Sequence, residues 1–249
     1  MTTAARTTAT KGAEVNSTNI NARLTGVLFV ITFITAIPAA LVLYVPVLDD
    51  PDYIVGGGGA DNRVFLGAFL ELLLIIATVG TALALFPILK RQNEGLALGY
   101  VAARIVECVF IGVGVLAVLG VVTLRQEAAG ADEGALAYAL AAIKDWTFLL
   151  GPGFFGVVGT GLMVGYLLYR SGLVPRWMAA LGLVGGPLIC LSGIAVLFDV
   201  FDAGGTGQAI ATIPEFLWEL ALGLYLTVKG FRPSPIAAAY DRDAGQAAA

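Results

Sequence analysis

The chain has 249 residues, of which 58% are hydrophobic and only 13% are charged, and its mean hydropathy is +0.88. Ordinary soluble domains contain roughly 45 to 50% apolar and about 25% charged residues, so this composition excludes a soluble globular protein. The net charge of -4 averages surfaces of opposite sign and indicates no nucleic-acid partner. The lack of histidine excludes bis-histidine haem sites, histidine-ligated zinc proteases and hydrolases with a histidine base.

The chain begins with a polar segment, residues 1–22, which has no apolar core and predicts a disordered tail rather than a signal peptide. Apolar runs long enough to cross a bilayer follow. They cover about residues 24–48, 64–89, 96–122, 146–169, 177–198 and 213–228. The Ala-rich polar segment 233–249 predicts a second disordered tail. The sequence therefore predicts an all-α bundle of six transmembrane helices over residues 23–232, with the first helix bent at Pro38.

The charges between the spans predict the orientation of the bundle. An even number of spans places both termini on one side, and the side richer in Lys and Arg faces the cytoplasm. The side with the termini carries Arg6, Lys11, Arg23, Lys90, Arg91, Arg170, Arg176, Lys229, Arg232 and Arg242. The opposite side carries Arg63, Arg125, Lys144, Asp49, Asp50, Asp52, Asp61, Glu127, Asp132, Glu133, Asp199 and Asp202. We therefore expect a multi-pass protein of the cell membrane with both termini in the cytoplasm.

Four ionisable side chains lie within the predicted spans: Glu71, Arg104, Glu107 and Glu219. A charge at the centre of a spanning helix costs about 2.5 to 3.5 kcal/mol, so such residues usually face the bundle interior. Arg104 and Glu107 are three residues apart, which predicts an intrahelical ion pair. Three carboxylates and one guanidinium in a shared cluster would leave a charge of -2, so we expect at least one carboxyl to hold a proton near neutral pH.

Two interpretations of this charged cluster stay open. It is either the proton or cation site of a transporter or a buried ionic clamp that fixes helix packing. Two further acids near the ends of the spans are interpreted as structural. Glu215 follows Pro214 and is interpreted as an acid at the start of a helix, where it complements the helix dipole. Asp145, beside Lys144, is interpreted as an interfacial anchor.

The remaining motifs indicate packing rather than chemistry. Cys108 and Cys190 lie in apolar runs and predict free thiols, and no metal or nucleophile constellation is visible, so we expect no cofactor and favour a protein that is not an enzyme. Glycines four residues apart predict close helix packing within the bundle or, equally, a homo-oligomer or protein-partner interface. They are Gly95 with Gly99, Gly161 with Gly165, and Gly182 with Gly186. Gly172 permits a left-handed helix cap in the turn before Trp177.

Several of these features occur in an order and spacing typical of one family. They are Arg23 to Phe29, Phe86 to Lys90, Arg104 with Glu107, the turn from Ser171 to Trp177, and Glu219 followed by Lys229, Gly230 and Phe231. Over about residues 20–232 the chain resembles the bacterial integral membrane family catalogued as domain of unknown function 4386. The resemblance implies a six-helix inner-membrane protein and supplies no reaction or catalytic residue. A proton- or cation-coupled small-molecule carrier and a structural or partner-binding subunit remain the two hypotheses.

Overall fold

The computed structural model describes residues 2–48, 50, 53, 60–127 and 131–247, and this part of the chain is mostly helical and contains no strand. The helical segments that are long and apolar enough to span a membrane are Thr18–Leu48, Asp61–Leu89, Glu94–Gln126, Gly134–Ser171, Arg176–Leu197 and Thr206–Lys229. The predicted all-α fold with six candidate spans is confirmed. The side of the membrane on which the termini lie stays a prediction, and Asp49 and Asp52, which contributed to it, lie outside the described residues.

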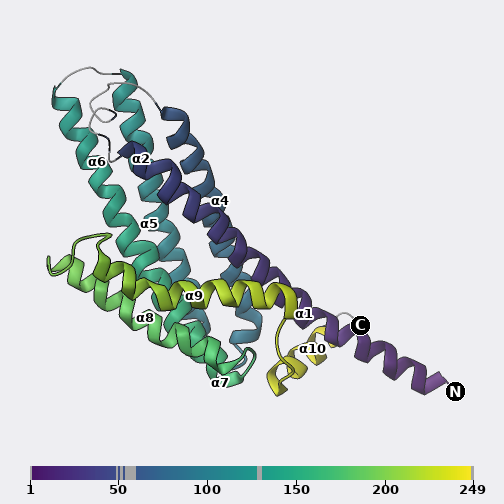
Figure 1. Cartoon of the computed structure of the whole chain (residues 1–249). Coiled ribbons are helices and arrows are strands. Elements are labelled where there is room, and N and C mark those ends of the chain that lie inside the picture. The colour runs from purple at the N-terminus through teal and green to yellow at the C-terminus, as the bar shows by residue number, and fades with distance from the viewer. Residues whose placement is uncertain (1, 49, 51–52, 54–59, 128–130, 248–249) are drawn as a thin grey trace. The chain divides into compact units, whose positions relative to one another are not determined.

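Two of the six spans contain π-helical segments, in which the turn is wider than in an α-helix. In the first span, α1 (Thr2–Ile37) continues through η1 (Pro38–Tyr44) into α2 (Val45–Leu48). The fourth consists of α6 (Ala131–Leu150), η2 (Gly151–Gly156), η3 (Val158–Val164) and α7 (Gly165–Ser171). The other helices are α4 (Asp61–Leu89), α5 (Glu94–Glu127), α8 (Arg176–Leu197), α9 (Thr206–Lys229) and α10 (Pro235–Ala247) (Figure 1).

Prolines accompany two of the π-helical segments. Pro38 is the first residue of η1, and Pro152 is the second residue of η2. Proline lacks a backbone N–H and its ring clashes with the carbonyl four residues earlier, so the regular α-helical ladder is interrupted there. At Pro38, where the sequence predicted a bend, the helix widens into a π-helical segment instead of ending.

Helices also occupy both segments for which the sequence predicted disordered tails. Helix α1 begins at Thr2, and α10 covers most of the C-terminal segment, where alanine is abundant and favours helix. The two are joined, because the backbone N–H and hydroxyl of Thr18 donate hydrogen bonds to Asp241, and Asn21 donates to the Tyr240 hydroxyl at 2.6 Å. The predicted division into tails and a membrane domain stays a prediction.

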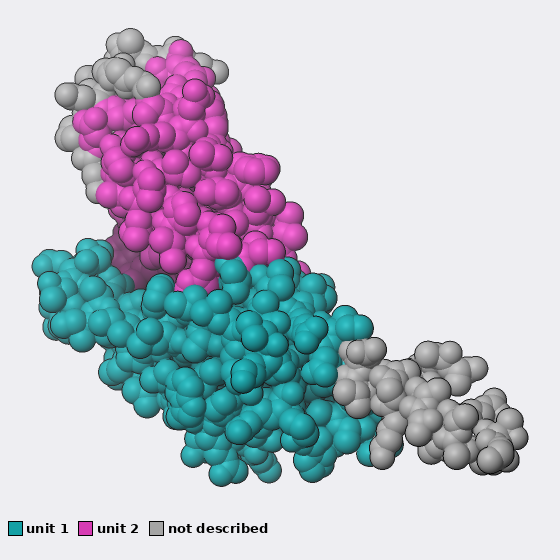
Figure 2. All heavy atoms as spheres, turned by 45° about the vertical axis from the view of Figure 1, so that its right-hand side comes forward, with its two compact units in different colours: residues 1–30, 80–103, 157–249 teal, residues 31–79, 104–156 magenta. Residues whose placement is uncertain are grey.

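The chain divides into two compact units (Figure 2). Unit 1 contains residues 1–30, 80–103 and 157–249, and unit 2 contains residues 31–79 and 104–156. Helices α1, α4 and α5 each contribute to both units. Each unit has its own buried core.

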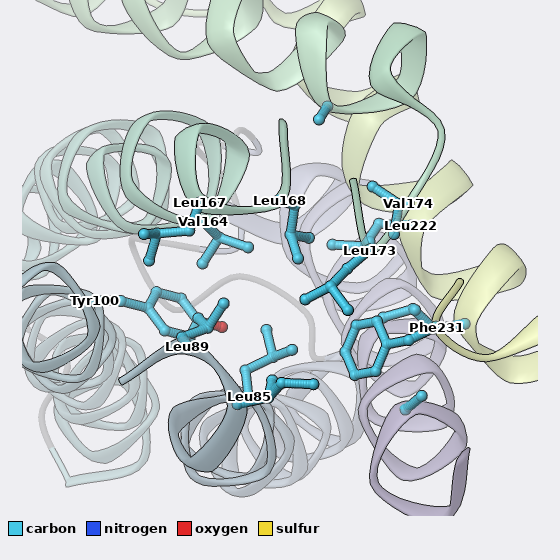
Figure 3. Close-up of a cluster of buried hydrophobic side chains, with 14 of the residues drawn as sticks. Leu85, Leu89, Tyr100, Val164, Leu167, Leu168, Leu173, Val174, Leu222 and Phe231 are labelled. Carbon is cyan, nitrogen blue, oxygen red and sulfur yellow. The ribbon is translucent and has the colours of Figure 1, made fainter. Parts of the chain in front are cut away.

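The core of unit 1 gathers large apolar side chains from several helices. In Figure 3, Leu85 and Leu89 of α4 and Tyr100 of α5 point toward Leu167 and Leu168 of α7. Leu222 of α9 and Phe231, just after that helix, extend this core. In unit 2 the buried core is formed by Ala39, Tyr44, Val47, Tyr53, Val64, Val118, Val121, Val122 and Ala137.

Glycines allow close helix approach inside unit 1. A Cβ atom added at Gly165 would lie 3.5 Å from backbone atoms of α8, and one added at Gly186 would lie within 3.4 Å of Leu162. The predicted pair Gly161 with Gly165 lies on the fourth span, and the pair Gly182 with Gly186 lies on α8. The two spans pack against each other at these glycines. Gly172, the C-cap of α7, has a φ of 67°, which confirms the left-handed cap predicted there.

Candidate functional site

The predicted ion pair of α5 is present and buried. Arg104 Nη1 lies 2.8 Å from Glu107 Oε2, and the two residues are only 4% and 5% exposed. They are one helical turn apart, so the pair needs no other element to form. It belongs to unit 2.

The π-helical segment η2 packs directly against this ion pair. A Cβ atom added at Gly156 would lie 2.7 Å from the Glu107 Cδ and within 2.9 Å of both carboxylate oxygens. A Cβ added at Gly151 would lie 2.6 Å from Phe110 Cβ. The absence of side chains at these two glycines allows the backbone of the fourth span to approach the charged face of α5. Gly151 and Gly156 therefore serve helix packing here.

A second buried charge pair lies in unit 2 and joins three elements. Lys144 Nζ of α6 donates to Glu71 Oε1 of α4 at 2.5 Å, and Tyr44 of η1 donates its hydroxyl to Glu71 Oε2 at 3.0 Å. The Lys144 ammonium also lies 4.9 Å from the centroid of the Tyr44 ring. All three side chains are buried. The Glu71 carboxylate is thus held between a cation and a phenol.

The two charge pairs lie at different heights in unit 2. Gly114 of α5 packs against Lys144, since a Cβ added there would be 3.2 Å from Lys144 Nζ. Gly114 follows Glu107 by seven residues, or about 10 Å of helix rise. Each carboxylate therefore has a cation of its own rather than sharing Arg104.

Lys144 is a buried charged residue that the sequence interpretation did not include among the candidate site residues. It was assigned to the loop side of a span expected to begin at residue 146, whereas the candidate span begins at Gly134. The available signal was the apolar and Ala-rich run before Trp146, which continues the helical pattern past Lys144. With Lys144 included, Glu71 and Glu107 are each balanced by a cation in unit 2. The charge of -2 expected for a shared cluster did not include Lys144.

A third buried carboxyl lies in unit 1. Glu215 is 2% exposed, and its Oε1 accepts a hydrogen bond from the Thr160 hydroxyl of η3 at 3.2 Å. The sequence interpretation of Glu215 as an acid in the first helical turn is wrong, because α9 begins at Thr206 and runs on through Pro214. A proline inside a membrane helix is tolerated when its neighbours satisfy the freed backbone groups.

The fourth predicted site residue has a different environment. Glu219 lies on α9 in unit 1 and is partly exposed, whereas Glu71, Arg104 and Glu107 belong to unit 2 and are buried. A single cluster of all four residues stays a prediction.

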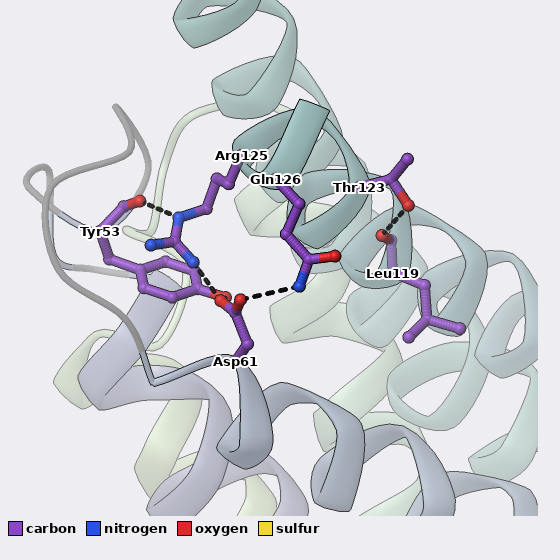
Figure 4. A network of polar contacts seen from close by, with 6 residues as sticks. All are labelled: Tyr53, Asp61, Leu119, Thr123, Arg125 and Gln126. Atoms are coloured by element: carbon purple, nitrogen blue, oxygen red, sulfur yellow. Dashed lines mark hydrogen bonds and ion pairs between the residues drawn. The ribbon is translucent and has the colours of Figure 1, made fainter. Parts of the chain in front are cut away.

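A polar network at one end of unit 2 joins the start of α4 to the end of α5 (Figure 4). Arg125 forms an ion pair with Asp61 and donates to the Tyr53 carbonyl, with its guanidinium 3.5 Å from the centre of the Tyr53 ring. The Tyr53 hydroxyl donates to Asp61 at 3.0 Å, and Gln126 donates to the other Asp61 oxygen at 2.9 Å. Burial, together with the hydrogen bond to Asp61, raises the pKa of Tyr53 to about 12.

The described part of the chain offers little for metal or thiol chemistry. Within it, no group of three or more Cys, Asp or Glu side chains could hold a metal ion. Cys108 and Cys190 are free, and Cys108 is buried.

Comparison with known proteins places the chain in a family. The family described as domain of unknown function (DUF4386) matches residues 24–230, a range that includes both charge pairs and Glu215. No curated protein and no solved structure matches the chain. The family match spans most of the chain, and together with the six apolar helices it identifies a multi-pass membrane protein. The chain belongs to the DUF4386 family.

Proposed function

We propose that this protein is a proton- or cation-coupled carrier of small molecules in the cytoplasmic membrane, with both termini in the cytoplasm. The observation that carries this proposal is the position of its π-helical segments. Tyr44 of η1 contacts Glu71, Gly156 of η2 packs on Glu107, and Thr160 of η3 contacts Glu215. Each of these three buried carboxyls therefore meets a π-helical segment.

π-Helical segments are rare and occur frequently at functional sites. In a π-helical segment each backbone hydrogen bond spans one residue more than in an α-helix. A return to α-helical hydrogen bonding would rotate the following residues about the helix axis. Movement of Tyr44, for example, would remove one hydrogen bond from Glu71. A clamp that only fixes packing needs no such irregular turns, since α-helical packing would serve it equally well.

The Glu71 and Lys144 pair provides a physical means of coupling to a cation. Protonation of Glu71 would leave the buried Lys144 ammonium without its countercharge, which is unfavourable in a low-dielectric interior. The ammonium would then lose its proton, move, or attract another anion. Proton binding and a change of structure are linked in this way, as a coupled carrier requires.

A structural or partner-binding subunit is the second candidate, favoured by a different observation. Glu71 and Glu107 are each neutralised by a neighbouring cation at 2.5 Å and 2.8 Å, an arrangement that also suits a fixed clamp. In that case the ion pairs hold helices together, and a homo-oligomer or another membrane protein would use an outer face of the bundle.

Proton flux in liposomes separates the two candidates. The purified protein would be reconstituted with an entrapped pH-sensitive dye, and Na⁺ gradients, K⁺ gradients and a panel of amino acids, sugars and amines would be applied. A carrier gives protein-dependent proton movement with at least one of these, which Glu71→Gln abolishes. Tyr166→Phe, at an exposed tyrosine on α7, is the control and should retain full flux.

Two results would count against the carrier. One is the absence of any protein-dependent movement of protons, Na⁺ or K⁺ under every gradient and solute of the panel. The other is undiminished flux in Glu71→Gln protein that remains folded. Either would favour the structural subunit.

A further inference from the structure

We propose that Glu215 is a binding site for an exchangeable proton in unit 1. The site is distinct from the two charge pairs of unit 2, and its occupancy can be measured without any transport assay. It goes beyond the proposed function, because a proton can bind at Glu215 whether or not the protein is a carrier.

The carboxyl of Glu215 lies in a space created by glycines. A Cβ atom added at Gly161 of η3 would lie 2.7 Å and 2.8 Å from the two carboxyl oxygens. A Cβ added at Gly185 of α8 would lie 2.5 Å from the backbone nitrogen of Glu215. Any larger residue at either position would collide with Glu215. The bundle thus makes room for a carboxyl group at a place where an apolar side chain would be easier to bury.

Thr160 gives Glu215 a hydrogen-bond partner that suits both protonation states of the carboxyl. Lys144 and Arg104, the partners of Glu71 and Glu107, can only donate hydrogen bonds and therefore favour the ionised carboxylate. The Thr160 hydroxyl lies 3.2 Å from Glu215 Oε1 and can either donate to a carboxylate or accept from a carboxylic acid. Glu215 keeps this hydrogen bond in both protonation states.

Thr160 is itself held in place. Its backbone carbonyl accepts a hydrogen bond from the indole N–H of Trp218 at 3.2 Å, and both residues are fully buried. Trp218 lies on α9 three residues after Glu215, so one helix supplies both the carboxyl and the group that positions its partner. The π-helical segment η3 and helix α9 are therefore joined through Thr160 by two hydrogen bonds.

A proton fits this site better than a metal ion does. Hard cations such as Ca²⁺ take six to eight oxygen ligands, and among the described residues no group of three or more Cys, Asp or Glu side chains could hold a metal ion. A proton needs no further oxygen. A bound proton also removes the cost of burying a carboxylate charge.

Two other titratable groups must be separated from Glu215 in any test. Cys190 of α8 interacts electrostatically with Glu215, and Glu219 follows it one turn later on α9. Cys190→Ser and Glu219→Gln are therefore the matched controls, and Glu71→Gln is the control for unit 2.

Infrared spectroscopy of the purified protein tests the proposal, because a protonated carboxyl has a C=O stretch that a carboxylate lacks. Spectra would be recorded from about pH 5 to about pH 9. We expect a protonated-carboxyl band that is lost in Glu215→Gln and retained in the three control variants. The band should shift on transfer to D₂O, since the proton exchanges with solvent.

The proposal is overturned if Glu215→Gln has the same carboxyl bands as the unmodified protein at every pH, or if the band does not shift in D₂O. If Glu215→Gln does not fold, the same spectra are recorded on Thr160→Val. Loss of the hydroxyl changes the frequency of the Glu215 band if the site is as described, and an unchanged spectrum overturns it. If Glu71→Gln protein keeps the Glu215 band, the proton site in unit 1 is supported. If the same protein shows no proton flux in liposomes, the carrier proposal is supported independently.

Discussion

Lys144 and Glu71 form a buried ion pair between α6 and α4, with Nζ and Oε1 2.5 Å apart. The pair lies within candidate spans and is completed by Tyr44 from a third element of unit 2. A buried pair is not necessarily more stabilising than a well-packed apolar pair, but breaking it leaves one charge uncompensated. The pair therefore makes the packing of unit 2 sensitive to the charge on either residue.

The first prediction concerns the removal of one partner. Lys144→Met should lower the free energy of unfolding by about 3 to 5 kcal/mol, because Glu71 would remain buried without its cation. The double variant Glu71→Leu with Lys144→Met should recover most of that loss. Reversible unfolding in mixed micelles of mild and denaturing detergents measures these values. Lys229→Met, at the exposed end of α9, is the control, and equal losses in the single and double variants would refute the prediction.

A second prediction compares two glycines of unit 2. Gly156→Ala should destabilise the protein by about 1 to 3 kcal/mol, because the new methyl group meets a Glu107 carboxylate that Arg104 holds in place. Gly112→Ala on α5 has no neighbour within 4 Å and should stabilise the protein by about 0.5 to 1 kcal/mol through helix propensity. The same unfolding assay decides this, and a neutral Gly156→Ala would show that Glu107 yields easily.

A third prediction follows from the pKa of Tyr53, which burial and the hydrogen bond to Asp61 raise to about 12. The pKa is higher in the folded protein than in the unfolded chain, where it is 10.0. The stability that Tyr53 contributes is therefore complete below about pH 10 and is lost as the pH rises toward about 12. Above that range the phenolate would lie buried beside Asp61.

Absorbance of tyrosinate checks this value directly. The difference between the titrations of the unmodified protein and Tyr53→Phe should contain one component with its midpoint near pH 12. Asp61→Asn should lower that midpoint, because the acceptor carboxylate is lost while the Arg125 cation remains nearby. A Tyr53 component at pH 10 would contradict the burial of this side chain.

The fourth prediction is the orientation in the membrane. If both termini are cytoplasmic, green fluorescent protein fused after residue 249 should fluoresce, and alkaline phosphatase at the same position should be inactive. A phosphatase inserted after Asp202, between α8 and α9, should be active. The reverse pattern would show that the distribution of Lys and Arg was misread.

The sequence by itself determined the properties that depend on local composition. Stretches of about 20 apolar residues must be helical in a bilayer, since each backbone polar group is then satisfied within its own segment. The Arg104 and Glu107 pair belongs to the same class, because a spacing of three residues on one helix fixes their proximity. The left-handed cap at Gly172 likewise follows from the residue type and the turn.

Only the tertiary structure decided which buried charges have which partners. Hydropathy locates the middle of a span well but its ends poorly, so Lys144 was assigned to a loop and Glu215 to a helix start. Their surroundings depend on packing between segments far apart in the sequence, 73 residues for Lys144 and Glu71 and 55 for Thr160 and Glu215. No local pattern encodes such contacts, because they depend on how the helices pack against one another.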